Sequence, residues 1–216
     1  MSQAELFDAP APAALPDNPL GLSAGEAAAF FELSADAFTA ALYARMSDLP
    51  VGEEIGRFIG KVSAAKDRAA AAHAAFDRSD PDTAAVLDAA RRVWVEIHRV
   101  TGFLRFAPAE DGVYTALCAP DYYILPALAE HFTLRFGEMP WAIIDEKRGL
   151  CLYRKSGGKA RIEALAAGTD AKSGAKDPWE DLWRLYHRSI NNESRKNPRL
   201  QRQFLPERHR KYMIEL

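Results

Sequence analysis

The stretch between residues 86 and 153 constrains the fold most, because its hydrophobic pattern changes period several times along the chain. Apolar residues recur every three or four positions from 86 to 100, which predicts one face of a helix that Gly102 ends. The runs 103–106 and 113–118 are short and are either apolar or alternating. They predict the two strands of a β-hairpin.

A second helix and a second hairpin follow this first pair. Apolar residues again recur at helical spacing from 125 to 136, Asp121 is a suitable N-cap, and Gly137 is placed to end the helix. The runs 141–145 and 150–154 predict two more strands joined by a short turn. This order of helix, hairpin, helix, hairpin predicts an α+β fold with a mostly antiparallel sheet.

The flanking segments extend this centre into a single α+β domain over residues 26–216. Residues 1–25 are rich in alanine and proline, which predicts a disordered tail. Residues 26–80 predict a helical lobe, 81–165 the α/β core, and 178–216 a helical and basic C-terminal segment. The residues expected to pack as one cluster are Val93, Trp94, Ile97, Phe103, Phe106, Tyr114, Leu125, Leu128, Phe132, Trp141, Ile143 and Leu152.

The C-terminal segment is predicted to begin with an amphipathic helix over residues 179–190. Pro178 suits its first turn and Asp177 is a suitable N-cap. Residues 159–165, before this helix, can add an edge strand to the sheet. The apolar spacing of the helix predicts that its hydrophobic face is buried against the core, through Leu182, Trp183, Tyr186 and Ile190.

The composition is ordinary for a soluble globular protein, with 48% hydrophobic and 27% charged residues. The net charge of −2 indicates no particular partner. Both cysteines, Cys118 and Cys151, fall in predicted strands, so we expect buried free thiols in a reducing compartment. We find no zinc-type Cys/His spacing, no apolar run of membrane-spanning length and no signal-peptide pattern, so we expect no metal, no cofactor, no membrane association and a cytoplasmic location.

The charge of the chain is segregated toward its C-terminus. Residues 184–216 hold nine basic and three acidic residues, a local charge of +6, so the rest of the chain carries −8. Such a segment suits phosphate binding through arginine forks and amides; the alternative is a solvated face whose arginines pair with acids elsewhere. The residues assigned to nucleic-acid contacts are Arg188, Arg195, Lys196, Asn197, Arg199, Arg202, Arg208, Arg210 and Lys211.

Four residues are candidates for catalysis: His98, Asp121, His131 and Glu193. A histidine paired with a carboxylate can perform acid–base chemistry or hold a metal, but no spacing here is diagnostic, and capping would account for Asp121. No nucleophile elbow is present, and Gly157-Gly158 lacks the third glycine and the following helix of a phosphate-binding loop.

The N-terminal tail carries one short motif, Gln3-Ala4-Glu5-Leu6-Phe7. The pattern Gln-x-x-Leu-Phe resembles the peptide by which bacterial DNA-processing proteins bind the replication sliding clamp. Leu6 and Phe7 would enter an apolar groove and Gln3 would fix the orientation. The alternative is a chance match in a disordered tail.

Three segments together carry a resemblance to a known family: EIHRVTGFLRF (96–106), DGVYTALCAPDYYILPALAEHFTLRFGEMPWAIIDEKRG (111–149) and LWRLYHRSINNESRKNPRLQRQFLPERHRKYMIEL (182–216). They resemble the uncharacterised bacterial DNA-metabolism or DNA-repair proteins that are typically encoded beside a DNA-repair radical-SAM protein and are sometimes fused to a uracil-DNA-glycosylase-like domain. The tail pattern Ile-x-x-Glu-x-x-x-Asn-Pro, here 190–198, recurs in that family with the helix–hairpin–helix–hairpin core.

The resemblance covers about Phe38 to the C-terminus. Family members usually begin with a strand-like Tyr-Asp-Gly-Ser-Phe segment, which this chain replaces with its Pro/Ala tail. The family has no established reaction, so the resemblance implies no catalytic residue. It implies a DNA-binding accessory protein that acts with a radical-SAM partner. The alternatives are an enzyme acting on a nucleobase or nucleotide, and a protein–protein adaptor that docks through the helix 179–190.

Overall fold

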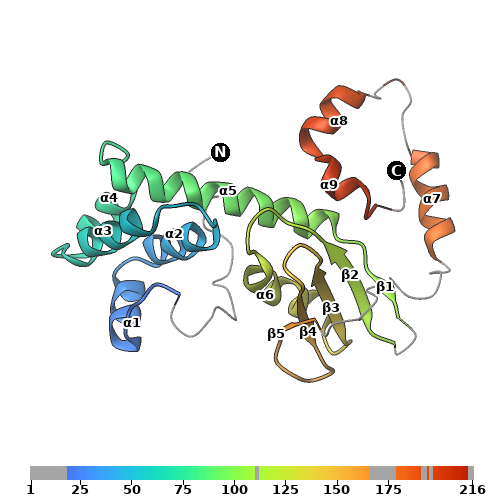
Figure 1. The fold of residues 1–216 in the computed structure, drawn as a ribbon, viewed down its shortest axis with the longest axis horizontal. Coiled ribbons are helices and arrows are strands. Elements are labelled where there is room, and N and C mark those ends of the chain that lie inside the picture. Colours follow the sequence, from blue (N-terminus) through green and yellow to red (C-terminus); the bar gives the residue numbers. More distant parts are fainter. Residues whose placement is uncertain (1–18, 110–111, 166–178, 191–193, 195–196, 214–216) are drawn as a thin grey trace. The chain divides into compact units, whose positions relative to one another are not determined.

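A computed structural model describes residues 19–109, 112–165, 179–190, 194 and 197–213 (Figure 1). The chain divides into two compact units. The first takes the residues up to His98 together with Asp121–His131, and the second takes Arg99–Pro120 together with the residues from Phe132 onward. The single domain over 26–216 stays a prediction.

The first unit is helical, as predicted for the N-terminal region. The residues Leu49-Pro50 separate two of its helices, as expected from the restriction that proline places on the backbone. The side chain of Ser34 caps the second helix by accepting a hydrogen bond from the Ala37 N–H at 3.2 Å. The helices are α1 (Ala24–Leu33), α2 (Ala35–Met46), α3 (Gly52–Ser63), α4 (Arg68–Phe76) and the part of α5 (Pro81–Phe103) up to His98.

Helix α5 is longer than the sequence predicted. Asp80 begins it by accepting the N–H groups of Asp82 and Thr83, both at 2.9 Å. Gly102 does not end it, since the helix continues to Phe103. A glycine inside a helix costs only about 1 kcal/mol relative to alanine. The predicted strand 103–106 is therefore wrong.

The second unit contains a five-stranded sheet in the order β1-β2-β3-β4-β5. Three of the four strand pairs are antiparallel, so the predicted α+β class and mostly antiparallel sheet are confirmed. The exception is the parallel pair β2–β3, because helix α6 (Leu125–Phe136) connects these two strands. The strands are β1 (Ala107–Pro108), β2 (Tyr114–Cys118), β3 (Trp141–Asp145), β4 (Leu150–Arg154) and β5 (Arg161–Ala164).

The second half of α6 packs on the sheet through aromatic rings. Phe132 lies 6.1 Å from Trp141 and 5.1 Å from Phe106, measured between ring centroids, and Phe106 lies 4.7 Å from Phe136. Phe132 and Trp141 are fully buried, which confirms the expected burial of both. In the first unit, the expected core residues that are buried are Val93, Ile97, Leu125 and Leu128.

The C-terminal segment is helical, as predicted. It contains α7 (Trp179–Ile190), α8 (Pro198–Phe204) and α9 (Glu207–Arg210). The proposed N-cap Asp177 and first-turn Pro178 of α7 lie outside the described residues. Among the helices described here, none combines the length and the apolar character that crossing a membrane requires.

Candidate functional site

The end of the C-terminal segment, α9 and the residues just after it, contacts the rest of the second unit through His209, Lys211 and Tyr212. His209, in α9, is buried, and its ring lies 5.6 Å from the ring of Phe103. Just beyond α9, the hydroxyl of Tyr212 donates a hydrogen bond to Glu146 in the β3–β4 turn. Lys211 forms an ion pair with the same carboxylate at 3.0 Å. Glu146 therefore connects the C-terminal segment to the sheet.

These contacts shift the pKa values of Glu146 and Tyr212. The hydrogen bonds from Tyr212 and Lys211 lower the pKa of Glu146. Burial, and secondarily the hydrogen bond to Glu146, raises the pKa of Tyr212 to about 12. Because the pKa of Glu146 is depressed in the folded state, its contribution is present at neutral pH and is lost as the pH falls through its folded-state pKa.

We expect the Tyr212 ring resonances to follow the titration of Glu146 when the pH is lowered from 7 to 3. The midpoint should lie below the usual range of a glutamate, because the two donors favour its charged form. Glu146→Gln should abolish this titration, whereas Glu130→Gln, at an exposed position on α6, should leave it unchanged. An unaltered NMR titration in the Glu146→Gln variant would contradict the connection.

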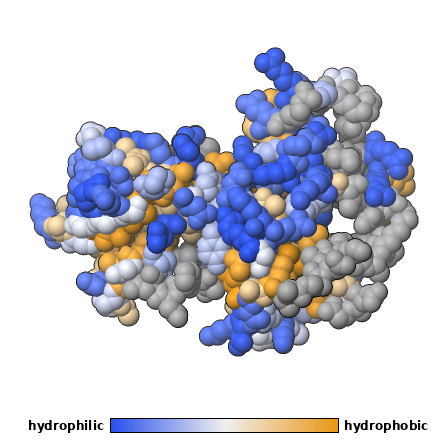
Figure 2. Space-filling view, in the orientation of Figure 1, coloured by the Kyte–Doolittle hydropathy of each residue, from blue (hydrophilic) through white to orange (hydrophobic). Residues whose placement is uncertain are grey.

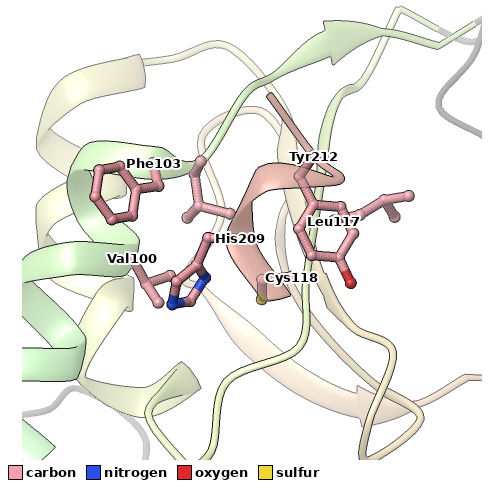
Figure 3. Close-up of a pocket in the computed structure, with 7 residues that line it drawn as sticks. Val100, Phe103, Leu117, Cys118, His209 and Tyr212 are labelled. Carbon is pink, nitrogen blue, oxygen red and sulfur yellow. The ribbon is translucent and has the colours of Figure 1, made fainter. Parts of the chain in front are cut away.

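A small pocket lies beside this anchor (Figure 3). Its volume is about 10 Å³, close to the room that one water molecule needs. A nucleobase does not fit in such a space. The lining residues are Val100, Phe103, Leu104, Leu117, Cys118, His209 and Tyr212.

The predicted nucleic-acid residues have several different environments. Arg188 on α7 and Arg199 on α8 are exposed. Lys211 pairs with Glu146, an acid outside the segment, whereas Arg210 lies 3.7 Å from Glu207, an acid of the segment itself. In the orientation of Figure 2, hydrophilic residues cover much of the surface over α8 and α9.

The remaining members of that set have structural roles or are not described. Asn197 caps α8 by accepting the N–H of Leu200 at 3.0 Å, so its side chain is used within the fold. Arg208 is half-buried. Arg195, Lys196 and the side chain of Arg202 lie outside the described part of the chain.

The predicted burial of the α7 face is wrong for two of its members. Leu182 is 53% exposed and Tyr186 is 52% exposed. Leu185, on the same side of the helix, is 57% exposed. The side chains of Trp183 and Ile190 lie outside the described residues. The amphipathic spacing was correct, but spacing does not determine what covers an apolar face.

The catalytic candidates are at the surface where the structure describes them. His98, Asp121 and His131 are all exposed, and Glu193 lies outside the described residues. His98 stacks on Trp94, with ring centroids 5.6 Å apart and planes inclined by 9°. Asp121 precedes the first residue of α6 by four positions, so its predicted role as the N-cap is wrong. Within the described residues, no group of three or more His, Cys, Asp or Glu side chains could hold a metal ion.

Sequence reasoning missed a buried carboxylate in α5. Glu96 is 3% exposed, and its two oxygens accept the N–H groups of Asp121 and Tyr122, both at 2.7 Å. Its spacing from Val93 and Val100 places it on the apolar face of the helix, which was the available signal. Glu96 therefore fixes the backbone of the segment that leads into α6.

Two arginines, the half-buried Arg148 and the buried Arg154, were also missed. Arg148 donates to Asp145 and to the Pro120 carbonyl, both at 3.1 Å, and Asp145 is fully buried. Arg154 is 9% exposed and donates to the Gly158 carbonyl at 2.7 Å. A single sequence gives no sign that these arginines differ from the exposed ones, because their acceptors are set by strand pairing.

These observations define a class of protein: an α+β unit with an open sheet, followed by a helical and basic C-terminal segment. The chain belongs to the family described as a domain of unknown function, DUF4130, whose model matches residues 55–215. Neither a curated protein nor a solved structure matches the chain significantly.

Proposed function

We propose that this protein is a DNA-binding accessory protein of bacterial DNA repair or modification that acts with a radical-SAM enzyme. The charge segregation of the C-terminal segment, +6 within a chain of −2, is the observation that carries the proposal. Attraction to the phosphate backbone is the usual source of affinity for a DNA-binding surface of this sign. The resemblance to DNA-repair proteins encoded beside a radical-SAM protein supports the choice of partners.

The way the segment is anchored favours this function. The buried His209, the Tyr212 hydroxyl and the Lys211 ammonium make the contacts that hold it. Arg188 and Arg199 are exposed and are not part of that anchor. Exposed guanidinium groups can form two parallel hydrogen bonds with one phosphate, so these two arginines are the first to test.

Reversing the charge of both, Arg188→Glu with Arg199→Glu, is expected to weaken binding to duplexes of every sequence alike. Each lost phosphate contact removes about 0.9 from the slope of log affinity against log salt, so the pair should flatten it by roughly 1.8. The measurement is a fluorescence-anisotropy titration at several salt concentrations.

Arg68→Glu is the matched control, because Arg68 is an exposed helical arginine of α4 in the other unit. All three substitutions lie at exposed positions, so the melting temperature should stay close to that of the wild type. If the double variant binds as tightly as the wild type at low salt, the basic segment is a solvated face and this proposal loses its support.

A protein–protein adaptor is the second candidate. Leu182, Leu185 and Tyr186 are exposed at the spacing of one helix face, which is the pattern by which a helix enters an apolar groove of a partner. The sliding-clamp contact through Gln3, Leu6 and Phe7 lies outside the described residues and stays a proposal of the same kind. The enzyme alternative stays a prediction, which the small pocket beside His209 does not test.

A further inference from the structure

The β4–β5 hairpin carries three exposed cations within seven residues, two in the turn and one at the start of β5. Lys155, Lys159 and Arg161 are all exposed, and the sequence Lys-Ser-Gly-Gly-Lys-Ala-Arg contains no acid. We propose that this hairpin is a second phosphate-binding surface, which contacts the sugar–phosphate backbone of the nucleic acid. The inference rests on the proposed function and adds a contact region that the basic C-terminal segment does not include.

The hairpin has a tight and specific turn. The Gly158 N–H donates to the Lys155 carbonyl at 2.9 Å, which closes a four-residue turn. Gly157 has a φ of +67°, in the region that favours glycine. A Cβ on Gly158 would lie 3.3 Å from the Lys155 carbonyl oxygen, so the backbone approaches closely there as well. The two glycines thus set the shape of the turn between the two lysines.

A buried arginine holds this turn in place through hydrogen bonds to backbone carbonyls. Arg154 is the last residue of β4, and it donates to the carbonyls of Gly158 and Gly137. It also lies 3.8 Å from Glu138. One side chain therefore ties the β4–β5 turn to the loop that precedes β3. Because the turn is fixed before a ligand arrives, binding a phosphate would order little more than the lysine side chains.

The cations of the turn remain available for a ligand. Within the described residues, neither Lys155 nor Lys159 forms an ion pair or a side-chain hydrogen bond. Other lysines of the chain are engaged: Lys61 pairs with two aspartates and Lys211 pairs with Glu146.

Two acids close to the turn, Glu138 and Glu163, have other partners. Glu138 lies beside Arg154, and Glu163 accepts the Tyr153 hydroxyl at 2.7 Å. Neither carboxylate therefore makes a direct contact that neutralises the lysines. Flexible, exposed ammonium groups of this kind meet phosphates as point charges, so the expected ligand is the nucleic-acid backbone, without preference for base sequence.

The test is the salt dependence of duplex binding by Lys155→Gln with Lys159→Gln. Two lost contacts should flatten the slope of log affinity against log salt by roughly 1.8. The fall in affinity between 50 and 200 mM salt should therefore be roughly 12-fold smaller for this variant than for the wild type. Lys66→Gln, at an exposed lysine of the first unit, is the control and should behave as the wild type. Circular dichroism establishes that the double variant is folded.

A second readout does not depend on any variant. In the wild-type protein, acetylation of Lys155 and Lys159 by an amine-reactive reagent should slow when duplex is added, whereas acetylation of Lys66 should not. If Lys155 and Lys159 are not protected and their variant keeps the wild-type slope, while Arg188→Glu with Arg199→Glu flattens it, the hairpin proposal is overturned and the proposed function stands. If the wild-type protein does not bind duplex at low salt, both proposals are overturned.

Discussion

Phe132→Ala is expected to lower the free energy of unfolding of the second unit by about 3–5 kcal/mol. Phe132 is fully buried, and its ring contacts Phe106, Phe136 and Trp141. Removing the ring leaves a cavity between α6 and the sheet in addition to the lost transfer free energy. Urea unfolding followed by tryptophan fluorescence measures the change, since Trp141 lies in the same cluster.

Leu134→Ala is the matched control for that experiment. Leu134 lies two residues further along the same helix but is 76% exposed, so its truncation should change the free energy of unfolding by no more than about 0.5 kcal/mol. A loss below about 1 kcal/mol for Phe132→Ala would mean that the aromatic cluster is not the core of this unit.

Glu96→Ala should produce the second large effect. It removes the acceptors of two backbone N–H groups, those of Asp121 and Tyr122, which now form hydrogen bonds of 2.7 Å with the carboxylate. An N–H group that loses its acceptor in a buried setting costs about 1–3 kcal/mol. The free energy of unfolding should fall by about 2 kcal/mol, the lower end of the range for two such groups. The reason is that Asp121 is exposed, so water can reach its N–H group.

Glu96→Gln separates the hydrogen bonds from simple packing. The amide has nearly the same shape but offers one acceptor oxygen, so one N–H group would face an NH₂ group. Its destabilisation should lie between those of the wild type and Glu96→Ala in urea unfolding. Equal stability of all three proteins would show that water replaces the carboxylate without cost.

Local patterns in the sequence predicted the regular elements well where the pattern was strong. The strands 141–145 and 150–154 and the helix 125–136 have the predicted bounds. The error at Gly102 arose because a single glycine is a weak signal, whose cost of about 1 kcal/mol the rest of a long helix can offset.

The candidate site could be predicted only in part. The accumulation of positive charge near the C-terminus is a property of the sequence and was found there. The pairing of Lys211 and Tyr212 with Glu146 could not be found, because those residues are 65 and 66 positions apart along the chain. The exposed lysines of the β4–β5 turn were not singled out, since nothing local distinguishes an exposed lysine from a paired one.

The sequence by itself determined the order of helices and strands, the α+β class and the segregation of charge, because periodicity, capping and composition act over a few residues. Only the tertiary structure decided that β2 and β3 run parallel, that Glu96 and Arg154 are buried, and that Leu182 and Tyr186 are exposed. The direction of a strand pair and the burial or exposure of a side chain each depend on which distant segment of the chain packs against it. The free energy of such a contact belongs to the pair of segments and cannot be read from either one alone.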